Sequence, residues 1–206
     1  MDGDEDSILV ERAQRNGEYF SVLYKKYADP VCKYLLARVD FDRAIAEDIM
    51  QDVFIRAFEH IKQYEYQGVP YRAYLFTIAH NLLVNHYRDK KTVQLEEISE
   101  DEDQHGEKII DRAEVKMEAQ EIWHAVAELP NTERDTLLLR YKSEMSVKEI
   151  AGVMHKTANA VKLALCHGRK KLAKDPSICC IHNGARCACG GKCSCRTGVF
   201  THLIRA

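Results

Sequence analysis

Hydrophobic residues recur at helical spacing through most of this chain, and no segment alternates apolar and polar residues as a surface strand would. The first apolar stripe consists of Phe20, Leu23, Tyr24 and Tyr27. We expect its helix to stop at Asp29–Pro30, because aspartate favours the N-cap and proline the first position of a helix. A second helix then carries Val31, Tyr34 and Leu35. The pattern predicts an all-α fold.

The third predicted helix, residues 43–62, has the clearest two-sided pattern. Its apolar stripe consists of Ile45, Ile49, Phe54, Ala57, Phe58 and Ile61. Its opposite face is acidic and polar, with Glu47, Asp48, Gln51, Asp52 and Glu59. We therefore expect one side to pack into a core and the other to stay on the outside.

An aromatic loop and a long helix follow. Gly68 and Pro70 mark the loop QYEYQGVPY, residues 63–71, and the helix spans residues 71–91. The aromatic and basic residues that alternate here are Tyr64, Tyr66, Tyr71, Arg72 and Tyr74, with Arg88 further along. Aromatic rings beside cations suit unpaired nucleotides, because every base has a face on which a ring can stack. The alternative interpretation is that several of these tyrosines belong to the core.

Composition divides the chain into five segments. They are an acidic N-terminal tail (1–16), a first helical domain (17–92), an acidic linker (93–113), a second helical domain (114–174) and a small irregular cysteine-rich tail (175–206). The linker is assigned from EEISEDED, residues 96–103, which has six acids and no base and therefore indicates a solvated segment.

The second domain contains a predicted helix-turn-helix at residues 146–172. Ser146 and Glu149 have the spacing of a capping box, which fixes a helix start. A turn at 154–156 leads to Thr157, a second N-cap, and residues 156–174 hold six lysines and arginines without an acid. Such a hairpin places its second helix in the DNA major groove. An ordinary helical hairpin with a solvated charged face is the alternative.

Overall charge and hydropathy exclude several classes of protein. The 206 residues carry a net charge of −2, so DNA binding has to rest on local basic faces. The first residues, MDGDEDS, lack the basic-then-apolar layout of a signal peptide, and no apolar run approaches the ~18 residues of a membrane span. We therefore expect a cytoplasmic protein with no membrane partner, in a compartment that disfavours disulfides.

The cysteines are concentrated near the end of the chain. Six of the eight lie within residues 179–195, at Cys179, Cys180, Cys187, Cys189, Cys193 and Cys195. Residues i and i+2 of an extended segment face the same side, so each C-x-C pair can present both thiolates to one ion. Thiolates suit soft or borderline ions, which predicts a site for a thiophilic metal: copper, zinc or cadmium. A purely structural zinc clip and redox-active thiols are the alternatives.

Taken together, these segments resemble the extracytoplasmic-function (ECF) sigma factors of bacterial RNA polymerase. AEDIMQDVFIRAFEHI is similar to region 2.2 of that family, and PYRAYLFTIAHNLLVNHYRDKK to the segment that reads the −10 promoter element. ELPNTERDTLLLRY with SVKEIAGVMHKTANAVKLALCHGRKKL resembles region 4, which reads the −35 element. The tail resembles that of the metal-responsive CorE-like group, whose sensor is built in, and leaves open whether a separate anti-sigma protein exists.

The resemblance implies a role for each surface. Core RNA polymerase would be bound through Asp48, Gln51 and Asp52. The loop at 63–71 would hold a base flipped out of the non-template strand. The −10 contacts would be Tyr64, Tyr66, Tyr71, Arg72, Tyr74, His80, Asn81 and Arg88. The −35 contacts would be Lys156, Thr157, Asn159, Lys162, His167, Arg169 and Lys170. The chain departs from the family where Leu163-Ala164 replaces a Ser-Arg pair and His155 replaces a glycine.

The sequence thus predicts a metal-responsive sigma factor that is not an enzyme and that directs transcription initiation by core RNA polymerase at specific promoters. One rival is a stand-alone metal-responsive repressor that uses only the hairpin at 146–172. That interpretation gives no role to the acidic face at 43–62 or to the aromatic loop. Another rival is a thiol redox enzyme, but the tail has neither a βαβ pattern nor a C-x-x-C motif.

Overall fold

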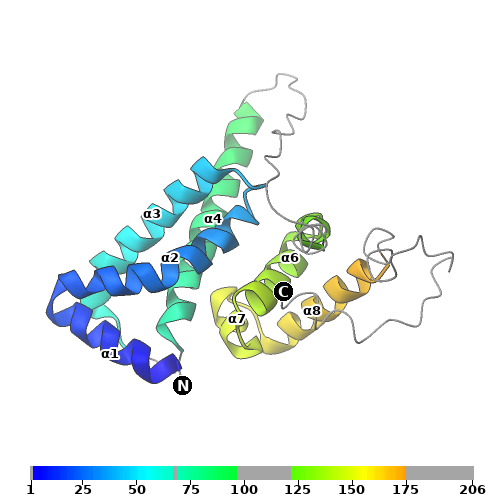
Figure 1. The fold of residues 1–206 in the computed structure, drawn as a ribbon. Helices are drawn as coiled ribbons and strands as arrows, with labels where there is room; N and C mark the ends of the chain where they lie inside the picture. Colours follow the sequence, from blue (N-terminus) through cyan, green and yellow to red (C-terminus); the bar gives the residue numbers. More distant parts are fainter. Residues whose placement is uncertain (1, 67–68, 97–121, 175–206) are drawn as a thin grey trace, which may run out of the picture.

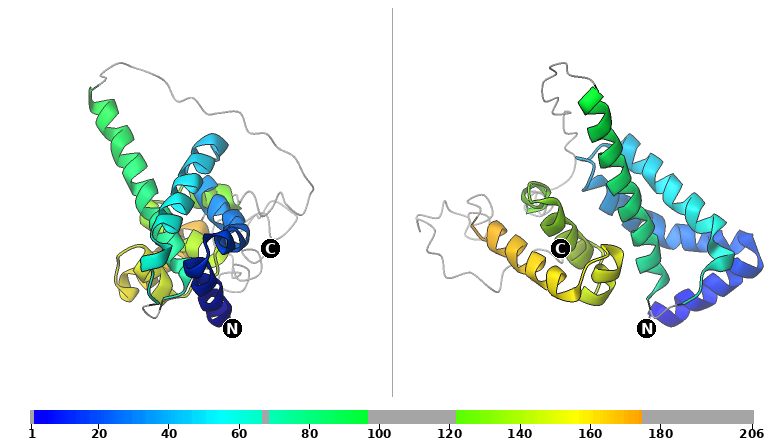
Figure 2. Two further views of the ribbon diagram at one scale, coloured as in Figure 1. Left: turned by 90° about the vertical axis from the view of Figure 1, so that its left-hand side faces the viewer. Right: turned by 180° about the vertical axis from the view of Figure 1, so that it is seen from behind.

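A computed structural model of the chain describes residues 2–66, 69–96 and 122–174. All regular structure within these ranges is helical, as the sequence predicts. The helices form two groups that lie side by side (Figures 1 and 2). The cysteine-rich tail with its six candidate ligands, residues 97–113 of the predicted linker and residues 114–121 of the second domain lie outside the described residues.

The first group is built around three long helices. Its elements are α1 (Asp2–Arg15), η1 (Gly17–Tyr19), α2 (Phe20–Leu36), α3 (Arg43–Glu59), η2 (Ile61–Gln63) and α4 (Tyr71–Glu96). Asp42 caps α3, its side chain accepting a hydrogen bond from the Ile45 N–H at 3.1 Å. Helices α2, α3 and α4 pack against one another, and α1 lies across α2 and the start of α4 (Figure 1).

The second group is smaller. Residues 122–127 are helical and are followed by α6 (Asn131–Leu137), the π-helical turn η3 (Leu138–Lys142), α7 (Val147–Val153) and α8 (Ala158–Leu172). Helix α8 packs closely on α6, because a Cβ added at Gly168 would lie 2.9 Å from Leu137 Cδ1. Glycine at this position therefore sets how near the two helices approach, and so fixes the orientation of α8.

Two predictions about the first 36 residues are wrong. The predicted N-terminal tail is instead helical, since α1 spans Asp2–Arg15 and buries Val10 and Ala13 against the bundle. The predicted break at Asp29–Pro30 is also absent, because α2 runs through it with Pro30 inside the helix. An internal proline removes one backbone hydrogen bond. The neighbouring Tyr27 and Val31 are nevertheless buried on one face, and this packing keeps the helix continuous.

Two further boundaries shift by a few residues. The predicted helix at 43–62 ends at Glu59 and is followed by the short 3-10 turn η2. Helix α4 continues to Glu96, so the first residues of the predicted linker, 93–96, are helical. The predicted helix-turn-helix is confirmed as α7 and α8.

Buried charges join the two groups. Arg38, just after α2, places Nε 2.6 Å from Asp135 Oδ1 of α6, and both side chains are 3% exposed. Tyr87 of α4 donates a hydrogen bond to the Arg38 carbonyl, and its ring lies 5.4 Å from the guanidinium. A second pair, Arg72 of α4 and Glu149 of α7, spans 3.1 Å. The two groups therefore share an interface that contains ion pairs as well as apolar side chains.

Candidate nucleic-acid interface

The helix-turn-helix is held by both predicted caps. The Glu149 N–H donates to Ser146 Oγ at 3.2 Å and the Ser146 N–H donates to Glu149 Oε2 at 2.7 Å, which completes the capping box. Thr157 Oγ1 accepts from the Ala160 N–H at 3.2 Å and begins α8. His155 in the turn has φ +51°, a left-handed conformation that glycine adopts without steric cost. The turn is formed despite the histidine.

The outer face of α8 is basic and exposed. Its inner face buries Val161, Leu165 and Leu172. The predicted −35 contacts all lie outside: Lys156, Thr157, Asn159, Lys162, His167, Arg169 and Lys170 are exposed. The Arg169 guanidinium lies 5.4 Å from the Tyr141 ring centre, which restrains its direction. This face has the exposure and sign of charge that contact with a DNA duplex requires.

Four of the predicted −10 residues gather in one aromatic cluster. The ring centre of Tyr64 lies 5.1 Å from those of both Tyr71 and Tyr74, and Tyr71 and Tyr74 are 5.6 Å apart. Tyr66 is 64% exposed beside them. Burial raises the pKa of Tyr64 to about 12 and the pKa of Tyr71 further still, so both phenols stay protonated at physiological pH.

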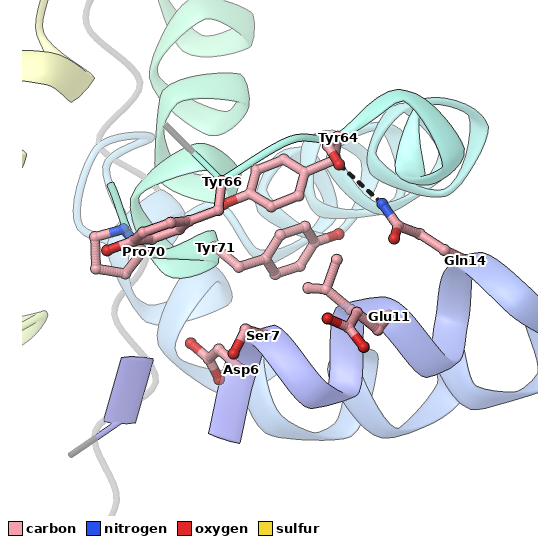
Figure 3. Close-up of a pocket in the computed structure, with 9 residues that line it drawn as sticks. Asp6, Ser7, Glu11, Gln14, Tyr64, Tyr66, Pro70 and Tyr71 are labelled. Carbon is pink, nitrogen blue, oxygen red and sulfur yellow. Dashed lines mark hydrogen bonds between the residues drawn. The ribbon is translucent and has the colours of Figure 1, made fainter. Parts of the chain in front are cut away.

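A pocket of about 180 Å³ opens between this cluster and α1 (Figure 3). Asp6, Ser7 and Glu11 rise from α1 on one side, and Tyr66, Pro70 and Tyr71 face them from the other. Gln14 fixes the loop to α1, because its Nε2 donates to the carbonyls of Ile61 at 3.0 Å and Tyr64 at 2.8 Å. The pocket offers stacking faces, a carboxylate and phenol hydroxyls at one place.

The other predicted −10 residues lie apart from the pocket. Arg72 is paired with Glu149 of α7. His80 is buried, with Nδ1 3.3 Å from the Tyr34 hydroxyl and 3.8 Å from Asp135 Oδ2. Asn81 and Arg88 are exposed, but Arg88 lies 17 residues along the helix from Tyr71, about 26 Å away. His80 is covered by the second helical group in this arrangement, so its contact with DNA stays a prediction.

Burial sets the charge of the groups at the interface between the two helical groups. It lowers the pKa of His80 to about 4, and the positive charge of Arg38 acts in the same direction, so His80 is neutral. Burial raises the pKa of Asp135 to about 6, although Arg38 and Arg134 oppose this rise. Arg38 Nε and Asp135 Oδ1 are close but not aligned for a hydrogen bond. The pair is thus held mainly by charge.

The predicted polymerase-binding residues share the outer face of α3. Asp48, Gln51 and Asp52 are exposed, with Asp48 one helical turn before the other two. Ile55 continues the same face and is 54% exposed. The arrangement gives a partner two carboxylates, an amide and an adjoining apolar side chain.

Sequence reasoning missed several residues that the fold brings into these surfaces. Glu11 and Gln14 reach the pocket because α1 is a helix, and the spacing of Val10 and Ala13 was the available signal for that helix. Nothing in a single sequence pairs Arg38 with Asp135, which lie 97 positions apart along the chain. None of the described helices combines the length and hydrophobicity that a membrane span requires. Within the described ranges, no three His, Cys, Asp or Glu side chains cluster as metal ligands.

The exposed basic helix and the aromatic pocket define a two-domain helical DNA-binding protein. Family comparison identifies the class more narrowly: the Sigma-70 region 2 model matches residues 23–93, and the Sigma-70, region 4 model matches residues 119–172. The chain therefore belongs to the sigma-70 family of RNA polymerase sigma factors, within its ECF group. Sigma factors are transcription initiation factors and are not themselves enzymes, in agreement with the sequence analysis.

Curated relatives are similar over most of the chain. The ECF sigma factor BldN of Streptomyces coelicolor is 31% identical over 81% of this chain, which spans 64% of the length of BldN. The ECF sigma factor SigM of Bacillus subtilis is 28% identical over 73% of this chain and 90% of its own length.

Two solved structures share the fold. CnrH, in complex with the cytosolic domain of CnrY, aligns with a TM-score of 0.61 at 21% identity over 82% of this chain and 94% of that one. RpoE of Bartonella quintana, in complex with the anti-sigma factor NepR, aligns with a TM-score of 0.57 at 19% identity over 74% of this chain and 93% of that one.

Proposed function

We propose that this chain binds core RNA polymerase and directs it to promoters whose −10 and −35 elements the chain reads, under the control of a metal bound by its cysteine-rich tail. The proposal that the chain reads promoters rests on one observation. The same chain holds two separate surfaces suited to DNA: the α8 face suits a paired major groove, and the aromatic pocket suits unpaired bases. A repressor that binds only duplex DNA needs no pocket of this kind.

The outer face of α3 is the proposed contact with polymerase. Asp48 and Asp52 would face a basic helical surface, which the family resemblance places on the clamp helices of the largest subunit. Ile55 would add a small apolar contact beside them. Charge pairs of this kind steer association and orient the partners.

On DNA, α8 would lie in the major groove of the −35 element. Asn159 is exposed in its first turn, where an amide can bond an adenine in bidentate fashion. Lys162 and Arg169 supply positive charge on the same helix. At the −10 element, the tyrosine cluster would hold the separated non-template strand.

The tail would make this activity respond to metal. We propose that Cys179, Cys180, Cys187, Cys189, Cys193 and Cys195 hold a copper, zinc or cadmium ion, as in the CorE-like group. Their thiolates fit a thiophilic ion by donor type, and a bound ion would cross-link segments that have few apolar residues. The tail follows directly after α8, so its ordering would change access to the DNA-reading helix.

Promoter-selective transcription with purified core polymerase tests the central proposal. We expect the chain to make core polymerase initiate at its promoter, and Asp48→Lys with Asp52→Lys to abolish initiation without weakening binding to −35 duplex DNA. The matched control reverses two exposed acids on other helices, Glu5→Lys and Asp29→Lys, and retains activity. A chain that binds promoter DNA and blocks transcription, yet never supports initiation, would establish the repressor instead.

The role of the tail needs a separate experiment. Copper, zinc and cadmium are titrated into the same reaction, with the wild type beside a variant whose six tail cysteines are all serine. We expect one metal to change transcription by the wild type only. Identical metal responses in the two proteins would contradict the sensor. Metal binding without any effect on transcription would indicate a structural clip. A metal response in a reaction that contains only the chain, core polymerase and promoter DNA would show that control does not require an anti-sigma factor.

A further inference from the structure

Leu163 is an exposed apolar side chain in the middle of the basic face of α8. It is 60% exposed, and no other large hydrophobic residue is exposed among residues 122–174, all of which the structure describes. At 3.6 residues per turn, it lies about 200° around the helix from both Val161 and Leu165, which are buried. Leu163 is therefore opposite the stripe that packs α8 onto its own group.

The neighbours of Leu163 on this face are polar or basic. Asn159 lies one turn before it and His167 one turn after it, and both are exposed, as is Lys162 beside it. Single exposed hydrophobic residues are common on protein surfaces, so exposure alone identifies no partner. The surrounding charge does, because residues 156–174 contain six lysines and arginines and no acid. The face therefore favours a polyanion, and the helix-turn-helix that presents it suits a DNA duplex.

The position of Leu163 along α8 is one that reaches the edges of bases. The second helix of such a hairpin contacts bases with its N-terminal residues. Helix α8 begins at Ala158, so Leu163 is its sixth residue and lies in its second turn. Asn159, for which we propose a contact with a base, lies on the same face one turn earlier. Leu163 should therefore meet base edges rather than phosphates.

Leucine can recognise only one prominent feature of the major groove. Each base pair presents hydrogen-bond donors and acceptors there, and the C5 methyl group of thymine is the apolar group among them. A leucine that covered a donor or acceptor of another base would remove it from water without supplying a hydrogen bond, which weakens binding. Against the thymine methyl group, the same side chain buries apolar surface, which strengthens binding.

We infer that Leu163 is a specificity-determining residue that selects thymine at one position of the −35 element by packing against its C5 methyl group. The inference rests on the proposed function, because it requires α8 to lie in the major groove of that element. The chain departs from the family resemblance at Leu163 and Ala164. Ala164 is only 7% exposed, so Leu163 is the one of the two that can touch DNA.

The test removes the methyl group from the DNA and leaves the rest of the duplex in place. Duplexes that carry the −35 element are first selected from a randomised pool with the full chain bound to core polymerase. Each thymine is then replaced in turn by deoxyuridine, which differs only by that methyl group, and Kd is measured by fluorescence anisotropy. We expect one thymine at which the replacement weakens binding about fourfold, as burial of one methyl-sized group predicts.

Two variants show whether Leu163 is responsible for this preference. In Leu163→Ala, the thymine and deoxyuridine duplexes should bind equally, at the affinity that the wild type has for the deoxyuridine duplex. The side chain is exposed and alanine favours helices, so the midpoint of thermal unfolding should not fall. The control is Val22→Ala on α2, which shortens another exposed hydrophobic side chain and should keep the fourfold preference.

The outcomes separate the inference from the proposed function. If the complex with core polymerase enriches no duplex sequence, the proposed function fails. If it enriches a sequence in which no thymine responds to deoxyuridine, or if the response persists in Leu163→Ala, the inference fails and the proposed function stands. If the two duplexes bind equally and Leu163→Ala instead weakens binding of the chain to core polymerase, Leu163 contacts a protein and the inference fails as well.

Discussion

The two surfaces that we propose as DNA contacts differ in how far each is exposed in the free chain. On α8 and in the two residues before it, every predicted −35 contact is exposed. On α4, Arg72 is paired with Glu149 of α7, and His80 is buried beside Asp135 of α6. A DNA duplex can reach α8 as the chain stands, whereas Arg72 has to leave Glu149 before it can bind a phosphate. Region 4 thus covers part of the region 2 surface that is predicted to read the −10 element.

Charge distribution explains the difference. Residues 156–174 contain no acid, and the cations of α8 therefore have no opposite charge within their own segment. Lys171 pairs with Glu133 of α6 at 2.9 Å. The cations of region 2 that face region 4 meet acids there instead. Arg38 meets Asp135 and Arg72 meets Glu149. Changing those acids should therefore affect the covered surface of α4, around Arg72 and His80, and leave the open surface of α8 unchanged.

The largest effect is expected for Asp135→Ala. Removing one member of a buried pair leaves the other charge buried without compensation, which costs about 3–5 kcal/mol. We expect this loss in the free energy of unfolding measured with urea, together with a larger radius of gyration in X-ray scattering as the two regions separate. The α8 surface should keep its affinity for −35 duplex DNA.

The control for this variant is an exposed pair of similar length. Arg43 and Glu47 lie 2.7 Å apart, with side chains 83% and 42% exposed. Solvent screens such a pair, so Glu47→Gln should cost no more than about 0.5 kcal/mol. An equal loss in the two variants would mean that the Arg38–Asp135 contact is not specifically stabilising.

The pH dependence of stability gives the next largest effect. The buried His80, with a pKa of about 4, takes up its proton only well below the usual 6.5, so its contribution to stability is lost as the pH falls from 6.5 to 4. Between pH 4 and pH 6, the folded Asp135 carboxyl, whose pKa is about 6, keeps its proton, whereas the unfolded carboxyl, whose pKa is 3.8, has lost it. Its effect has the opposite sign, because stability falls as the pH rises from 4 to 6. The two slopes largely cancel in the wild type.

Single substitutions should reveal each slope. In Asp135→Asn only the histidine remains, so the variant should lose up to about 3 kcal/mol relative to wild type between pH 6.5 and pH 4. In His80→Gln the carboxyl remains, and stability should rise over the same acidification. The measurement is urea unfolding at several pH values, read as the difference from wild type. Parallel curves for all three proteins would show that neither group is perturbed by the interface.

The sequence predicted the open surface better than the covered one. The caps at Ser146 and Thr157 are local signals, and six lysines and arginines without an acid mark the exposed face of α8 directly. His80 was assigned to DNA from the family resemblance, and its burial beside Asp135 depends on a distant segment that the local sequence does not reveal. The local signal at Pro30 also gave the wrong result, because burial of Tyr27 and Val31 decided the helix instead. In both places, packing between segments that are distant in the sequence determined the structure, and local sequence patterns do not report such packing.

A smaller effect is expected on the open surface itself. Lys162→Ala removes one exposed cation from α8, so the dependence of log K on log salt should decrease by about one unit. Between about 50 and 200 mM salt, this amounts to a difference of about threefold in affinity for −35 duplex DNA. Fluorescence anisotropy measures it, and Lys25→Ala, an exposed cation on α2, serves as the control. An unchanged salt slope would remove Lys162 from the interface.

The smallest and most selective change is Glu149→Gln. Glutamine can still complete the capping box at Ser146, so α7 should remain intact, while the charge that holds Arg72 is lost. Partly exposed pairs contribute about 0.5 kcal/mol, so we expect binding of single-stranded −10 DNA by the free chain to strengthen only about twofold. The control is Glu133→Gln, which removes a pair of similar burial, Glu133 with Lys171, that lies wholly within region 4. A gain in Glu149→Gln alone would show that the covered surface is restrained by its own partner region, whereas a gain in both would point to a general effect of removing negative charge.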